Sequence, residues 1–153
     1  VGSFLGYVAY EGKLTAVLKP GERKCLKKLA VGGRFYPNVI IANRPRQYYL
    51  SAYLEGQDRP QFRFFAQHKD LAFPPAQLQV KMESNSVEIQ TDVFADMVKL
   101  DGEMEGLDVS DNYFHMAPHT KRIIRLSVLW GKPLIQRKLF LKALNSQAYE
   151  LTM

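Results

Sequence analysis

The sequence is poor in cysteine: among 153 residues it contains Cys25 alone. One cysteine cannot form an intrachain disulfide, and it cannot build a cysteine-based metal cage. No histidine and no second cysteine lie near it in ERKCLKKL. We therefore expect Cys25 to be a small buried hydrophobic residue.

Long apolar runs are also lacking. No stretch approaches the roughly 20 uninterrupted apolar residues that span a bilayer, so the sequence predicts no membrane partner. The opening VGSFLGYVAYEGK has neither the basic nor the apolar region of a signal peptide. Because the first residue is valine, we expect a processed chain or a piece of a longer protein, and this end predicts no compartment.

The motifs of common enzymes are missing. There is no GxSxG, no P-loop and no dinucleotide-binding glycine pattern. His115 and His119 have the i, i+4 spacing of zinc ligands on a helix, but Pro118 would break that helix. We predict no catalytic residue, no metal and no cofactor in this chain, and we expect both histidines to be satisfied turn or surface residues.

The densest acidic stretch, DGEMEGLDVSD, imitates a calcium loop. Asp101, Glu103, Glu105 and Gly106 fit the first half of such a loop, but Asn112 stands where a bidentate glutamate is needed. The same carboxylates resemble a glycosidase pair, but no neighbouring pattern buries one of them against an aromatic wall that would raise its pKa. We favour a solvated loop.

Positive charge is concentrated in the first part of the chain. Residues 1–66 hold 11 Lys and Arg against 4 Asp and Glu, whereas residues 67–153 hold 10 against 11. The basic residues are scattered, with no run of five or more and no nucleic-acid motif. This pattern predicts a solvated surface or a face that meets an acidic neighbour, and no nucleic-acid partner.

What the sequence does contain is the composition of a folded β protein. Hydrophobic residues make up 46% and charged residues 24%, which excludes a disordered chain. Short apolar stretches alternate with turn residues about every 8 to 12 positions, which is typical of an all-β sandwich. The spacing predicts an immunoglobulin-like antiparallel β-sandwich, with a partial second sandwich on the N-terminal side.

Period-2 patterning predicts strands at 3–10, 13–18, 48–54, 61–67, 78–82, 87–94, 98–105, 122–130 and 137–145. Residues 22–31 fit a strand or a helix. HKDLAFPP interrupts the pattern, because two consecutive prolines remove backbone donors. We place the domain boundary there: residues 1–67 form an incomplete linking β-sandwich segment, and residues 68–153 form the C-terminal immunoglobulin-like domain.

The stretch VSDNYFHMAP gathers polar residues at a turn. Ser110 and Asp111 are suited to accept backbone N–H bonds, and Asn112 tolerates a left-handed backbone. Tyr113 and Phe114 then point to opposite faces, one of them into the core. We interpret the motif as a strand-to-strand corner, comparable to the tyrosine corner of other sandwiches.

Aromatic residues raise the possibility of glycan binding. Strand alternation predicts that most of them face the core, since Phe62 and Phe64 share one strand face. An exposed row would instead form a sugar-stacking platform. The candidates for glycan contact are Trp130, Tyr48 and Tyr49.

SDNYF, followed by a proline-containing turn into KRIIRLSV, resembles the last domain of β-mannosidases of glycoside hydrolase family 2. YYLSAYLEGQDRPQFRFFAQ is similar to the hairpin that closes the preceding sandwich domain, and His68, Lys69, Asp70 and Leu71 occupy the crossover. LKPGERKCLKKLAV is similar to a turn and strand of that linking domain. The resemblance covers about residues 48–143.

The resemblance implies an immunoglobulin-like fold and a function without chemistry of its own. In such enzymes the catalytic glutamates lie on a central (β/α)8 barrel, so this chain would buttress that barrel. Its partners would be the other domains of the parent hydrolase and mannose-containing glycans, and the parent would be periplasmic, secreted or lysosomal. The alternatives are a carbohydrate-binding module and a surface adhesion or assembly domain.

Overall fold

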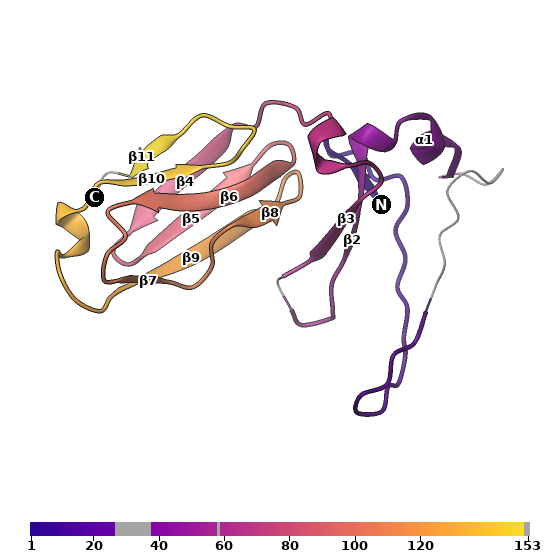
Figure 1. The fold of residues 1–153 in the computed structure, drawn as a ribbon, viewed down its shortest axis with the longest axis horizontal. Coiled ribbons are helices and arrows are strands. Elements are labelled where there is room, and N and C mark those ends of the chain that lie inside the picture. Colours follow the sequence, from indigo (N-terminus) through magenta and orange to yellow (C-terminus); the bar gives the residue numbers. More distant parts are fainter. Residues whose placement is uncertain (27–37, 58, 152–153) are drawn as a thin grey trace. The chain divides into compact units, whose positions relative to one another are not determined.

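The computed structural model describes residues 1–26, 38–57 and 59–151. Contacts within the chain divide it into two units, Val1–Ser3 with Tyr7–Ala72 and Phe4–Gly6 with Phe73–Met153 (Figure 1). The two units thus meet in sequence at Ala72 and Phe73. A boundary between independently folding domains at residue 68 stays a prediction.

The first unit contains a small antiparallel sheet in the order β1-β2-β3. The predicted hairpin at 48–67 is confirmed, because Tyr49 of β2 pairs with Phe64 of β3. The elements of this unit are β1 (Gly2–Ser3), α1 (Asn38–Asn43), η1 (Pro45–Gln47), β2 (Tyr48–Ala52), β3 (Gln61–Phe64) and η2 (His68–Asp70).

Two predicted strands near the start of the chain are wrong. The strand expected at 3–10 ends at Ser3, because the Ser3 N–H donates to the Tyr7 carbonyl at 2.7 Å and its hydroxyl accepts the Tyr7 N–H at 2.9 Å. This turn needs Gly6 at a φ of 93°, a requirement that period-2 patterning does not reveal. Residues 13–18 form no strand either.

Two further expectations concern residues 22–31. Cys25 is exposed, so the expectation of a buried residue is wrong. The ambiguous segment itself lies partly outside the described residues. At its first residue, the Glu22 N–H donates to the Lys19 carbonyl at 2.9 Å, and the Glu22 carboxylate accepts the Lys19 N–H. These two bonds close a tight turn.

The second unit is a sandwich of two four-stranded antiparallel sheets. One sheet has the order β4-β5-β9-β7 and the other β11-β10-β6-β8 (Figure 1). The strands are β4 (Leu78–Glu83), β5 (Ser86–Thr91), β6 (Ala95–Gly102), β7 (Leu107–Val109), β8 (Phe114–Met116), β9 (Lys121–Val128), β10 (Leu139–Lys142) and β11 (Tyr149–Leu151), with η3 (Leu134–Gln136) between β9 and β10. The predicted all-β sandwich is confirmed.

The core of this unit lies between the two sheets. Val87 and Ile89 from β5 pack in one cluster with Val98 and Leu100 from β6. The alternation predicted for β5 is confirmed, because Val87, Ile89 and Thr91 are buried while Gln90 is exposed. Burial of alternate side chains from both sheets is what stabilises a sandwich against unfolding.

Strand ends and irregularities differ from the sequence expectation. β6 begins at Ala95 and contains a bulge between Ala95 and Val98, where Met97 adopts a φ of 48°. β9 ends at Val128, so Leu129 and Trp130 belong to a loop. β11 was not predicted, because its run Tyr149–Leu151 is too short to show a period. No helix of the described residues is long and apolar enough to cross a membrane.

Candidate functional site

The SDNYF motif is the crossover between the two sheets. It leaves β7, which lies in one sheet, and enters β8, which lies in the other. Ser110 remains tied to the first sheet: its N–H donates to the Arg125 carbonyl at 3.0 Å, and its hydroxyl accepts the Arg125 N–H at 2.9 Å. Ser110 therefore extends the β7–β9 ladder by one residue and then lets the chain turn away.

Asn112 ties the same crossover to the second sheet. Its side-chain oxygen accepts the Leu100 N–H at 2.8 Å, and its amide nitrogen donates to the Leu100 carbonyl at 3.1 Å. The side chain thus imitates the backbone of a neighbouring strand. Leu100 is 2% exposed, so these bonds satisfy backbone groups that water cannot reach.

The left-handed residue of the corner is Tyr113, with a φ of 57°, and not Asn112 as the sequence suggested. Because the Asn112 side chain is engaged by Leu100, the reversal of the backbone falls on the next residue, whose N–H donates to the Asn112 oxygen at 3.1 Å. Tyr113 is exposed and Phe114 is buried. The two aromatic side chains therefore separate between solvent and core as expected.

Asp111 fastens the corner to β9. Its carboxylate forms an ion pair with Arg122 and also accepts the Asn112 N–H at 3.0 Å. The Arg122 guanidinium lies 4.3 Å from the centre of the Phe114 ring, a cation–π distance. The polar residues that resemble a reaction centre in the sequence are thus engaged in holding the two sheets together.

The acidic loop after β6 is organised around Arg137, which sequence reasoning did not single out. This side chain is only 6% exposed. Its guanidinium donates to the carbonyls of Glu103, Glu105, Trp130 and Lys132, at distances of 2.6 to 3.2 Å. One buried guanidinium thus provides donors for four backbone carbonyls of two loops. Nothing in the run QRKLF distinguishes Arg137 from a surface arginine.

Two carboxylates, one at the end of β6 and one in the loop after it, have depressed pKa values. The Lys132 ammonium, which donates to Glu103 at 2.8 Å, and the Lys138 N–H hold the pKa of the Glu103 carboxyl below its usual value. The Lys99 ammonium and the Gly102 N–H lower the pKa of Asp101 in the same way. These shifts favour the ionised form, whereas a general acid requires a raised pKa.

Trp130 lies against Gly106, at the turn that leads into β7. Gly106 has a φ of 67°, and a Cβ placed there would overlap the Trp130 carbonyl and approach the indole Cδ2 at 2.8 Å. Cδ2 is a ring-fusion carbon without a hydrogen, so Gly106 meets the ring at its face. Trp130 is nevertheless 59% exposed.

Tyr48 and Tyr49, the other candidates for glycan contact, are buried in the first unit and offer no open ring face. Tyr49 packs edge-on against Phe62, with ring centres 5.6 Å apart. Burial raises the pKa of the Tyr49 phenol to about 12. Trp130, the exposed candidate, belongs to the second unit, whereas both buried tyrosines belong to the first.

His115 and His119 lie on β8 and in the turn after it, not on a helix. The His115 Nδ1 lies 2.9 Å from the carboxylate of Asp96, which is 1% exposed. This pair joins β6 to β8 at the bulge that interrupts their ladder. In the described residues no three His, Cys, Asp or Glu side chains are grouped so that they could hold a metal ion.

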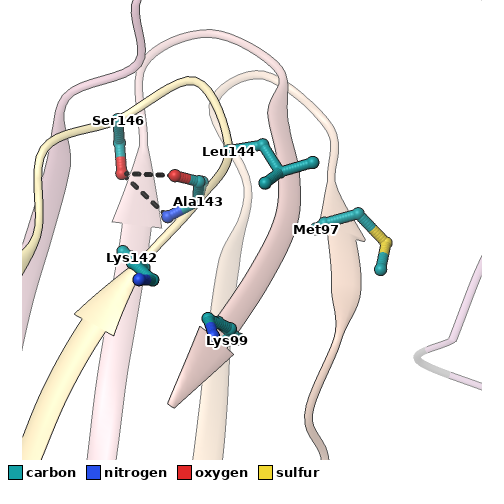
Figure 2. A pocket seen from close by; sticks show the side chains of 6 residues that line it. All are labelled: Met97, Lys99, Lys142, Ala143, Leu144 and Ser146. Atoms are coloured by element: carbon teal, nitrogen blue, oxygen red, sulfur yellow. Dashed lines mark hydrogen bonds between the residues drawn. The ribbon is translucent and has the colours of Figure 1, made fainter. Parts of the chain in front are cut away.

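A shallow hollow of about 250 Å³ opens beside the end of β10, lined by residues of β6 and of the loop after β10 (Figure 2). Lys99 and Lys142 occupy paired positions on neighbouring strands. The Asp101 carboxylate lies 2.7 Å from the Lys99 ammonium and 3.9 Å from that of Lys142. One carboxylate thus neutralises much of the positive charge that the hollow offers to an anion.

The comparison with protein families agrees with this geometry. Residues 73–147 match the family model Ig_mannosidase, described as an Ig-fold domain. These residues are thus similar to the Ig-fold domain that this family describes, and we refer to them as the Ig_mannosidase domain. The match begins at Phe73, the first residue of the main segment of the second unit, and ends between β10 and β11. No curated protein matches the chain.

The Ig_mannosidase domain includes the SDNYF crossover, the Arg137 loops and Trp130. The suspected relationship to β-mannosidase-type proteins is thereby confirmed for this part of the chain. The chain therefore contains an Ig-like domain associated with mannosidases.

Proposed function

We propose that the chain is the non-catalytic C-terminal β-sandwich region of a larger β-mannosidase-like hydrolase of glycoside hydrolase family 2, and that it buttresses the catalytic barrel. The observation that carries this proposal is the match of residues 73–147 to the Ig_mannosidase family. A domain of this kind supplies surface and rigidity to a multidomain enzyme, and its fold alone does not define an activity.

The pKa values and ion pairs of the carboxyl groups favour a structural role over a catalytic one. A glycosidase needs two carboxyl groups that face each other across a cleft, one of them with a raised pKa. Asp101 and Glu103 instead have lowered pKa values, because lysine and backbone donors engage them. Asp111 is paired with Arg122. We therefore assign the bond-breaking chemistry to another part of the parent protein.

The charge distribution supports contact with a neighbour. Residues 1–66 hold 11 Lys and Arg against 4 Asp and Glu. An excess of one sign favours association with a surface of the opposite sign. We propose that this basic part faces an acidic domain of the parent.

The experiment begins with the coding sequence upstream of Val1. We expect it to encode a (β/α)8 barrel with two glutamates at the ends of its strands. The parent is then compared with a version that lacks residues 73–153, and we expect the truncated protein to melt at a lower temperature. Equal melting temperatures would contradict the buttressing role.

A matched variant tests where the chemistry lies. In the full parent, Glu103→Gln removes one of the two carboxyl groups that have a lowered pKa, without changing the size of the side chain. We expect its kcat on an aryl β-mannoside to equal that of the unmodified parent. A loss of kcat with an unchanged melting temperature would place a catalytic group in this domain and would contradict the proposal.

A further inference from the structure

The segment between β9 and β10 exposes three large apolar side chains of the Ig_mannosidase domain. Leu129, Trp130 and Ile135 are 70%, 59% and 76% exposed. An exposed tryptophan in a soluble domain has a cost, because a large apolar area faces water. Such a residue is retained where the surface has a partner.

This loop is fixed in place from beneath. The Arg137 guanidinium donates to the Trp130 carbonyl at 3.2 Å and to the Lys132 carbonyl at 2.8 Å. The same group holds the carbonyl of Glu105, next to Gly106, at 2.6 Å. A single buried side chain therefore fixes both the strip of backbone under the indole and the backbone of Trp130 itself.

Gly106 decides how the indole lies. Because the contact at Cδ2 is through the ring face, one face of the indole rests on the glycine and the opposite face is open to solvent. Any other residue at 106 would overlap the Trp130 carbonyl and would carry a strained φ. The indole is therefore a flat, pre-positioned surface, which lowers the entropy lost when a ligand binds.

The surroundings of the indole provide hydrogen-bonding groups. Glu105 precedes Gly106 and is exposed, and no hydrogen bond or ion pair with the described residues engages its carboxylate. The Lys132 ammonium, bound to Glu103, is also exposed. An aromatic face, with an exposed carboxylate and an exposed ammonium on nearby residues of the same two loops, suits a ligand with one apolar face and a rim of hydroxyl groups.

We propose that Trp130 and Glu105 form a glycan-binding site that takes a neutral pyranose ring. The C–H face of the sugar stacks on the open face of the indole, and its hydroxyls donate to the Glu105 carboxylate. The site goes beyond the supporting role and does not depend on it. Only the choice of mannosides as the first ligands rests on the proposed function.

The test uses the fluorescence of the whole chain, because Trp130 is its single tryptophan. The chain is titrated with manno-oligosaccharides and, separately, with cello-oligosaccharides. We expect a saturable change in emission with a Kd on the order of 1 mM. If cello-oligosaccharides saturate the signal and manno-oligosaccharides do not, the result supports the glycan site but counts against a mannoside-type parent. The two proposals can therefore fail separately.

Variants identify the groups that bind. Glu105→Gln retains the fluorophore, and we expect it to weaken binding about threefold or more. Trp130→Ala is followed by calorimetry, and we expect it to abolish binding. Tyr53→Ala is the matched control, because it removes an aromatic residue of the first unit that is also well exposed, and we expect unchanged binding.

Two results would overturn the proposal. One is the absence of any saturable change with either series of oligosaccharides, in which case the apolar loop serves a protein contact. The other is a Trp130→Ala variant that binds as well as the unmodified chain. Circular dichroism of each variant verifies that it is folded, and Glu105→Gln keeps the test valid if Trp130→Ala does not fold.

Discussion

The side chain of Asn112 pairs with the backbone of Leu100 as though it were a neighbouring strand residue. Both backbone groups of Leu100 are engaged, the N–H at 2.8 Å and the carbonyl at 3.1 Å. Leu100 itself belongs to the core between the sheets. One side chain thus extends the pairing of β6 with β8 at the point where the chain arrives from β7 in the other sheet.

Asn112→Ala leaves these two backbone groups of Leu100 without partners. We expect the free energy of unfolding to fall by about 2 to 6 kcal/mol, since each of the two unsatisfied buried groups costs about 1 to 3 kcal/mol. Urea denaturation measures the change. Asn85→Ala is the control, because Asn85 is an exposed residue of the β4–β5 turn. An equal effect of both substitutions would contradict this role for Asn112.

Asp111→Ala removes the partner of the Arg122 guanidinium and an acceptor of the Asn112 N–H. We expect the free energy of unfolding to fall by about 1 kcal/mol or more. We expect no direct effect of this substitution on catalysis by a parent enzyme. A double-mutant cycle with Arg122→Ala isolates the pair, and we expect a coupling of about 1 kcal/mol. A stability-neutral Asp111→Ala would show that the corner does not depend on this ion pair.

Arg137→Lys keeps the positive charge but loses the planar fork that reaches carbonyls of two loops. We expect the free energy of unfolding to fall by about 2 kcal/mol. The emission of Trp130 should also move to longer wavelength, because the loop beneath it loosens. Lys138→Arg, at the neighbouring exposed position, should change neither quantity. If Arg137→Lys changed neither the free energy of unfolding nor the emission wavelength of Trp130, the proposed role of the guanidinium would be contradicted.

The raised pKa of Tyr49 predicts a loss of stability in strong base. Its pKa in the folded chain is about 12, against an ordinary value of 10.0. As the pH rises past 10, the unfolded chain releases the phenolic proton first. The stability contributed by Tyr49 is therefore fully present below pH 10 and is lost as the pH approaches 12.

Urea denaturation below pH 10 and near pH 12 measures this loss. Tyr49→Phe should reduce it, because the group that ionises is gone. Tyr53→Phe removes an exposed phenol instead and should leave the loss unchanged. A loss of the same size in Tyr49→Phe and in the unmodified chain would assign the effect to other groups.

The sandwich itself could be predicted from the sequence, and the reasons are local. In β5 every second residue is apolar, so the buried face containing Val87 and Ile89 follows from period alone. The same reasoning failed at 3–10, where SFLGYVAY has suitable alternation but Gly6 reverses the chain. A pattern of side chains does not show which glycine adopts a positive φ.

The candidate site could be predicted only in part, because its geometry depends on loops distant in sequence. Trp130 was identified as a candidate from its residue type, but its contact with Gly106 spans a separation that no local pattern encodes. Arg137 was missed, since its four acceptors lie in two loops that only the fold brings together. The sequence suggested Asn112 for the left-handed position of the corner, whereas the positive φ falls on Tyr113 and the pairing of Asn112 with Leu100 was not predicted.

The arrangement of Gly106, Trp130 and Arg137 also constrains how this loop can change over evolution. A side chain at position 106 would displace the indole of Trp130. A shorter residue at position 137 would no longer reach the carbonyls of Glu105 and Trp130, which Arg137 holds in place. Substitutions at these three positions should therefore be inherited together: relatives that keep the arginine and tryptophan should keep the glycine. Independent variation of the three positions among homologous sequences would show that the loop tolerates each change by itself.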